Sequence, residues 1–194
     1  YLRRQVAAAP QDMAARFNLA TVLTATGRGD EARPLALDHQ GHPGLARIAG
    51  YFNQQDGNLG EAVAAYRAGL NRAPQDWESW NNLGNCLVQL GDNAAAIGAF
   101  ENAINRSPFP SLPEIFLNLS QALGAVDRRD QRLGNAEEAA RRFPDHHGVL
   151  IELGLAQAAA GHRDLAEVTL RRAAEQEDHF GEARLELGLL LEND

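Results

Sequence analysis

The sequence predicts an all-α solenoid, in which pairs of helices repeat along the chain. Apolar residues make up 44% of the 194 residues, but aromatic residues only 6%, so the core must form from close helix contacts around small side chains. Two series of residues also recur with a common period near 34 residues. Repeats of that length are typical of stacked helix pairs.

The first series is Leu or Ala followed by a small residue, at spacings of 30, 34, 36, 34 and 34 residues. The members are Leu19-Ala20, Ala49-Gly50, Leu83-Gly84, Leu119-Ser120, Leu153-Gly154 and Leu187-Gly188. The second series consists of helix stops with the same period: Pro10, Pro74, Pro108, Pro144 and Asp178. Because the two series stay in phase, each period is one structural unit.

The clearest unit spans residues 77–110. It contains Trp80, Leu83, Gly84, Leu87, Gly91, Ala96, Phe100, Ala103 and Pro108. This pattern resembles the tetratricopeptide repeat (TPR) family. Its small residues leave room where the helix axes approach, Gly91 ends the first helix and Pro108 stops the second. A bulky residue at Gly84 would overpack this contact by about 1–3 kcal/mol.

The resemblance implies a single right-handed TPR superhelix over residues 1–194, with about five helix-turn-helix repeats. The predicted units are a partial one at 1–10, five at 11–42, 43–76, 77–110, 111–146 and 147–180, and a partial one at 181–194. Both ends are therefore expected to be half repeats. The last half carries Leu189, Leu190 and Leu191, which are too apolar for a solvated cap.

Two irregularities are expected in the array. Pro34 and residues 38–44 predict a short second helix in the first unit and a late start of the next helix. Three prolines within residues 108–113 predict an extended connection with Phe109 exposed in part.

Composition and charge argue against several classes of function. The net charge is −8, and all 18 basic residues are scattered arginines, so no nucleic-acid partner is expected. No apolar stretch is long enough for membrane insertion. The single cysteine, Cys86, cannot form an internal disulfide, which leaves a cytoplasmic and a periplasmic location both open.

In TPR proteins the first helices line a concave groove, and the resemblance transfers groove positions to this chain. The expected peptide-binding residues are Asn18, Thr21, Arg47, Tyr51, Glu78, Asn81, Asn82, Asn85, Asn118, Gln121 and Glu152. Side-chain amides both donate and accept, so they can bind a peptide backbone of any sequence. The asparagines look like the ladder in the TPR domains of O-linked N-acetylglucosamine transferases and of bacterial TPR proteins, here interrupted by Ile48, Glu152 and Glu186.

Acidic residues accumulate on the same face toward the C-terminus: Glu78, Glu114, Glu152, Glu182 and Glu186. They favour a basic or polar extended segment as partner. The alternative is that the carboxylates near helix starts only offset the helix dipole. A carboxylate clamp of the cochaperone type is not expected, because the chain has no Lys.

No catalytic, metal or cofactor site is expected. His39 with His42 and His146 with His147 lie at predicted turns without a third ligand, and Cys86 is expected to be a packed, inert thiol. The sequence therefore predicts a non-catalytic scaffold that binds an extended polypeptide. Two alternatives stay open: the substrate-recognition arm of a glycosyltransferase-like or sulfotransferase-like enzyme, and a homo-oligomer joined through its terminal helices.

Overall fold

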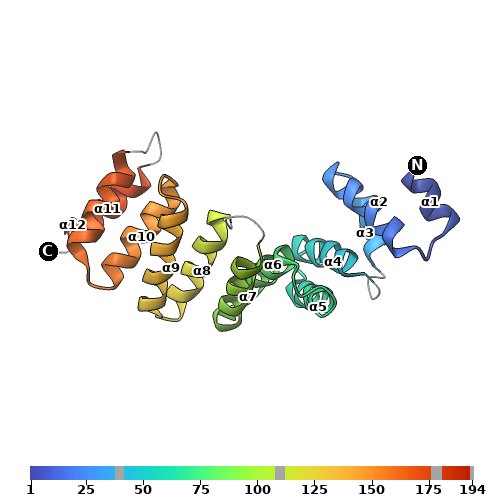
Figure 1. Ribbon diagram of the computed structural model, residues 1–194, viewed down its shortest axis with the longest axis horizontal. Coiled ribbons are helices and arrows are strands. Elements are labelled where there is room, and N and C mark those ends of the chain that lie inside the picture. The colour runs from blue at the N-terminus through green and yellow to red at the C-terminus, as the bar shows by residue number, and fades with distance from the viewer. Residues whose placement is uncertain (38–41, 108–111, 176–180, 193–194) are drawn as a thin grey trace. The chain divides into compact units, whose positions relative to one another are not determined.

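The computed structural model describes residues 1–37, 42–107, 112–175 and 181–192. These residues form twelve α-helices and no strand, which confirms the predicted all-α class. Contacts between helices divide the chain into two compact units, Tyr1–Arg106 and Ser107–Asp194. Figure 1 labels the helices of each unit.

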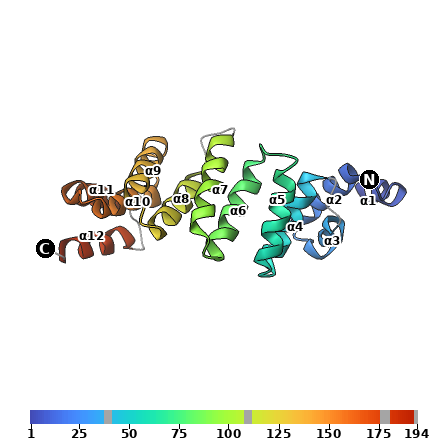
Figure 2. The same cartoon turned by 90° about the horizontal axis from the view of Figure 1, so that it is seen from below.

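The first unit holds one lone helix followed by three pairs. Its helices are α1 (Leu2–Ala8), α2 (Met13–Ala25), α3 (Gly29–Ala36), α4 (Pro43–Gln55), α5 (Leu59–Leu70), α6 (Trp77–Gln89) and α7 (Asn93–Arg106). The pairs are α2 with α3, α4 with α5, and α6 with α7, whose side-by-side packing is clear in Figure 2. The first helices also form a row, because α4 contacts both α2 and α6.

The second unit holds two pairs and a last single helix. Its helices are α8 (Pro113–Ala125), α9 (Arg129–Arg142), α10 (His147–Ala159), α11 (Arg163–Glu175) and α12 (Glu182–Glu192). Here α10 contacts both α8 and α12, so the first helices again form a row.

Each pair turns through one residue in the left-handed backbone region. Four pairs place glycine there, with φ between +72° and +84°, at Gly27, Gly57, Gly91 and Gly161. The pair α8 and α9 uses Asp127 instead, with φ +55°. An ordinary L residue in this region costs about 1–2 kcal/mol, although Asp tolerates it better than most.

In three pairs the recurring small residue of the first helix is a glycine that forms a seat for a large side chain of the second helix. A Cβ atom added to the glycine in three pairs would lie only 2.5–2.6 Å from that side chain. The three pairs are Gly50 with Tyr66, Gly84 with Phe100, and Gly154 with Leu170. The glycine is therefore required by its partner's bulk rather than by backbone conformation.

Pairs without this glycine fill the contact differently. In α8 the small residue is Ser120, and Asn135 of α9 reaches it: the Asn135 Nδ2 donates to Ser120 Oγ and to the Phe116 carbonyl, both at 2.8 Å. These bonds satisfy the buried Ser120 hydroxyl, as a buried polar group requires.

The predicted short second helix in the first pair is confirmed. Pro34 lies inside α3, which ends at Ala36, and α4 begins at Pro43. Part of the irregularity predicted at 38–44, namely residues 38–41, lies outside the described residues, as do residues 108–111 of the predicted extended connection, with Pro108 and Phe109, and the helix stop at Asp178.

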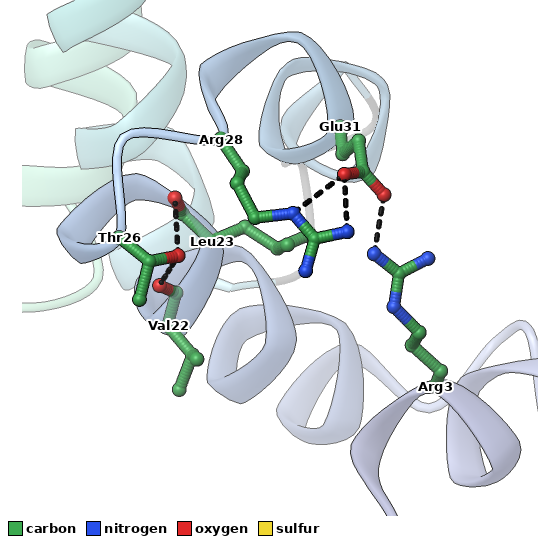
Figure 3. Close-up of polar contacts among 6 residues, drawn as sticks. All are labelled: Arg3, Val22, Leu23, Thr26, Arg28 and Glu31. Atoms are coloured by element: carbon green, nitrogen blue, oxygen red, sulfur yellow. Dashed lines mark hydrogen bonds and ion pairs between the residues drawn. The ribbon is translucent and has the colours of Figure 1, made fainter.

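Figure 3 shows how α1 is tied to α3. The Glu31 carboxylate accepts hydrogen bonds from Arg3 and from Arg28, whose Nε lies 2.7 Å away. These two bonds lower the pKa of Glu31. Nearby, the Thr26 hydroxyl donates to the Val22 carbonyl at 2.8 Å. Because these ionic side chains are exposed, the ion pair adds little to the docking of α1, whose Leu2 and Val6 pack against the buried core.

Candidate functional site

Eight of the eleven predicted site residues lie on the first helices of the first unit. They are Asn18 and Thr21 on α2, Arg47 and Tyr51 on α4, and Glu78, Asn81, Asn82 and Asn85 on α6. The spacing is three residues on α2 and four on α4, and on α6 the adjacent Asn81 and Asn82 are each three or four residues from Glu78 and Asn85, so the residues form one stripe along each helix. Asn18, Thr21 and Tyr51 are exposed and the others are half-buried. Since α2, α4 and α6 form a row, the stripes are neighbours.

An ion pair joins two of these stripes. Arg47 of α4 contacts Glu78 of α6, and its Nε also lies 3.7 Å from the Asp76 carboxylate. The Arg47 and Glu78 side chains are 29% and 47% exposed, so the pair adds little to stability. The pair does bring the two opposite charges together, and Glu78 therefore does not present an isolated negative charge to a ligand.

The hydroxyl of Tyr66 is the polar group that the sequence reasoning missed. The ring belongs to α5, is fully buried, and packs over Gly50. Its hydroxyl donates to Gln54 Oε1 at 3.3 Å. Burial raises the pKa of Tyr66 well above its ordinary value, and the positive charge of Arg47 opposes that shift. The available signal was Tyr at a place where a repeat can use Phe, because a buried hydroxyl needs partners.

Neighbouring asparagines on α6 are not equivalent. Asn81 Oδ1 is buried and has no hydrogen-bond partner among the described residues, which carries a desolvation cost of about 1–3 kcal/mol. The Asn82 side chain instead acts to lower the pKa of the Tyr66 hydroxyl. The sequence predicted both as groove residues on equal terms, and only the packing around them distinguishes the two.

The other three predicted site residues lie in the second unit. Asn118 is half-buried and Gln121 exposed on α8. Glu152 on α10 accepts two hydrogen bonds from Arg132 of α9, at 2.7 and 2.9 Å. The bond to Glu152 is the main cause of a raised pKa of Arg132. This two-bond ion pair neutralises the Glu152 charge. Arg132 was not among the predicted site residues because it comes from a second helix.

The residues with potential for chemistry have structural roles in the described part of the chain. Burial raises the pKa of the Cys86 thiol to about 11, so the thiolate is scarce near neutral pH. His42 and His146 accept backbone N–H bonds through Nδ1 at the starts of α4 and α10. No three His, Cys, Asp or Glu residues are grouped to hold a metal ion within the described ranges.

Membrane insertion was tested on the helices as well. Over residues 1–37, 42–107, 112–175 and 181–192, none of them combines the length and apolar character needed to span a bilayer.

Comparison with known proteins identifies the class of protein. The family described as tetratricopeptide repeat matches residues 1–46 and 54–110, more than half of the chain. The chain therefore belongs to the tetratricopeptide repeat family, as its motif predicted. No curated protein sequence matches it significantly.

Several solved structures share the fold at low sequence identity. YrrB, described as a TPR protein with an unusual peptide-binding site, is 18% identical with a TM-score of 0.81, covering 100% of this chain and 98% of YrrB. MamA from Desulfovibrio magneticus RS-1 is 15% identical with a TM-score of 0.71, covering 85% and 95%. PilF from Pseudomonas aeruginosa is 16% identical with a TM-score of 0.72, covering 93% and 85%. At these identities the likeness confirms the TPR solenoid fold alone.

Proposed function

We propose that this chain is a non-catalytic scaffold that binds an extended polypeptide segment on the first helices α2, α4 and α6. The observation that carries the proposal is the row of polar side chains, four of them asparagines, on these three helices, with Gln54 of α4 held by the Tyr66 hydroxyl. An extended backbone offers alternating N–H and C=O groups, which such amides bind irrespective of the ligand's side chains.

Two further features support this choice. Tyr51 exposes 41% of its surface in the same row, and an aromatic ring with a polar end is a common anchor for a bound segment. YrrB, which has this fold, is described as having a peptide-binding site. The surface of the second unit with Asn118 and Gln121 is a separate candidate for the same kind of contact.

Peptide selection tests the proposal directly. Random peptides displayed on phage would be selected on the immobilised chain, and a synthetic peptide from that selection titrated by calorimetry. We expect a micromolar Kd, equivalent to about −8 kcal/mol. Asn82→Ala should weaken binding about tenfold, because one hydrogen bond is lost and its partner stays desolvated.

The matched control is Asn105→Ala, which makes the same change at an exposed position of the second helix α7. It should bind like the wild type. Equal affinities of the Asn82→Ala and Asn105→Ala variants, or no peptide enriched over an empty surface, would refute the proposal.

Self-association is a second candidate that one observation favours. Space over Gly188 of α12 is open in the described part of the chain, whereas Gly50, Gly84 and Gly154 are each covered by a large side chain. Leu185 and Leu189 of α12 are 62% and 46% exposed. A helix from a second copy would cover this face. Sedimentation at several concentrations should show a dimer that Leu189→Glu abolishes, and a monomer at all concentrations would exclude it.

A further inference from the structure

A groove lies between the second helices α5 and α7, with α6, which contacts both of them, as its floor. Its volume is about 320 Å³, within the range of about 300–1,000 Å³ that is usual for ligand pockets. The lining residues that matter for its chemistry are Arg67, Asn71, Trp80, Leu83, Leu87 and Gly98. None of the described residues that line this groove is acidic.

The groove lies on the opposite side of α6 from the predicted peptide-binding stripe. Trp80, Leu83 and Leu87 are three and four residues apart, so they form one stripe along the helix. With about 3.6 residues per turn, this stripe lies about half a turn from Asn82 and Asn85. A ligand in the groove therefore does not compete with a polypeptide bound along α2, α4 and α6.

The Trp80 ring is held in place by two neighbours. Its Nε1 donates to the Pro74 carbonyl at 2.9 Å, and the Arg106 guanidinium lies over the ring, 5.6 Å from its centroid. The side chain is half-buried and lines the groove. A ring that is already fixed loses little freedom when an apolar group packs against it, which favours binding.

Gly98 keeps the α7 wall of the groove open. It lies inside the helix, where glycine is less favourable than alanine. Neither the backbone nor packing requires it, because its φ is not positive and an added Cβ atom would meet nothing within 4 Å. A larger side chain at this position would extend into the groove.

The α5 rim of the groove carries a positive charge that is not neutralised. Arg67 and Asn71 are four residues apart and exposed, and neither side chain has an ion pair or hydrogen bond to another described residue. Arg33, by contrast, pairs with Asp56. In a chain of net charge −8, a guanidinium beside an apolar groove complements a ligand that is apolar and negatively charged.

We propose that this groove binds a partner polypeptide through an apolar side chain that lies next to an Asp or Glu. The apolar side chain packs on Trp80, Leu83 and Leu87, and the carboxylate pairs with Arg67. The Asn71 amide can bond the backbone between them. This site goes beyond the proposed function, because it selects acidic and apolar side chains and lies on the other side of α6.

NMR titration with a synthetic peptide tests the proposal. The probe is an acetylated peptide with the order Gly-Ser-Leu-Glu-Leu-Ser-Gly, added to the isotope-labelled chain. The Trp80 Nε1–H and Gly98 N–H signals should shift to saturation with a millimolar Kd, since one buried side chain and an exposed ion pair stabilise a complex only modestly. Replacing the glutamate of the peptide by glutamine should weaken binding about two- to fivefold, and replacing both leucines by serine should abolish it.

Three results of this titration would overturn the proposal. They are the absence of a saturable shift, equal shifts with the leucine-free peptide, and equal shifts with hexanoate at the same concentration. The last result would show that the groove takes small carboxylates in general rather than a polypeptide.

Two variants change the groove itself. Gly98→Leu fills it and should abolish the shift of Trp80 Nε1–H. Its matched control is Gly134→Leu, at an exposed glycine inside α9 where an added Cβ atom also meets nothing within 4 Å, and this control should bind like the wild type. Asn82→Ala should also bind like the wild type, because it changes the opposite side of α6. Full binding by Gly98→Leu, or lost binding in Asn82→Ala, would contradict the site.

Arg67→Gln decides the ion pair and does not depend on how Gly98→Leu folds, which urea unfolding would check. The variant should bind the glutamate peptide about two- to fivefold more weakly than the wild type. It should also bind the glutamate and glutamine peptides equally, because the charge that distinguishes them has no partner. A preference for glutamate that persists in Arg67→Gln would overturn the assignment of Arg67.

Discussion

Replacing Gly84 by Ala should destabilise the first unit, whereas the same change at Gly98 should stabilise it. Both glycines lie inside helices, α6 and α7, where Ala is more favourable than Gly by about 1 kcal/mol. At Gly98 a new methyl group meets nothing within 4 Å. At Gly84 it would lie 2.5 Å from Phe100 Cε1 and 2.8 Å from two further ring atoms.

The contact at Gly84 decides the sign of the effect. Overpacking of this kind costs about 1–3 kcal/mol, which equals or exceeds the gain in helix propensity. Gly84→Ala should therefore lower the free energy of unfolding by about 0–2 kcal/mol, since the gain of about 1 is subtracted. Gly98→Ala should raise it by about 0.5–1 kcal/mol, so that the variants differ by roughly 1–3 kcal/mol.

Urea unfolding followed by tryptophan fluorescence would measure this difference. Both tryptophans of the chain, Trp77 and Trp80, lie in α6, so the signal reports on the unit that is changed. A second measurement adds Phe100→Ala to each variant. If the ring is the obstacle, Gly84→Ala should cost less beside Ala than beside Phe100, by about 0.5–3 kcal/mol. Equal free energies for Gly84→Ala and Gly98→Ala would refute the reasoning.

Three further predictions concern the turns, ion pairs and caps. Asp127→Gly should raise the free energy of unfolding by about 0.5–1 kcal/mol, because it relieves the left-handed residue of that turn; urea titration would measure it, and a loss would show that the Asp127 side chain matters more. Arg132→Ala should lower the free energy of unfolding by about 1–3 kcal/mol, because the Glu152 carboxylate, only 15% exposed, loses two hydrogen bonds. An unchanged midpoint of urea unfolding would contradict the pairing. Desolvation lowers the pKa of His42. The stability that neutral His42 contributes is therefore complete above pH 6.5 and is lost as the pH falls through the folded-state pKa. The melting temperature of His42→Asn should fall less at acidic pH than that of the wild type, and identical pH profiles would exclude this role.

The helix pairs were predictable because the residues that form each pair lie within one repeat of the sequence. The seat at Gly84, its partner Phe100 and the turn at Gly91 lie within one period of the sequence, and the structure places them as the motif implies. Asp127 shows the limit of this reasoning. The same turn forms there without glycine, because the packing of the helices on either side holds the backbone in this conformation.

The polar contacts were less predictable because they join different repeats. Glu78 meets Arg47 across two first helices, and Glu152 meets Arg132 of the preceding second helix. These pairs depend on how each helix is rotated relative to its neighbour. The sequence pattern within one helix does not determine that rotation. The capping role of His42 was not predicted for a similar reason: its bond to the Gly44 N–H depends on how α4 begins.

The feature that makes this chain a TPR solenoid also creates its candidate site. A glycine in the first helix is usually explained by packing, and Gly84 serves only that purpose, since it seats the apolar ring of Phe100. Gly50 seats a tyrosine, so the same gap carries a hydroxyl through the contact to the far side of α4. There the hydroxyl has to find a partner, because a buried unpaired polar group is costly, and it donates to the Gln54 amide of α4. One oxygen atom therefore distinguishes a repeat whose glycine contact is purely apolar from one whose contact also holds a side-chain amide.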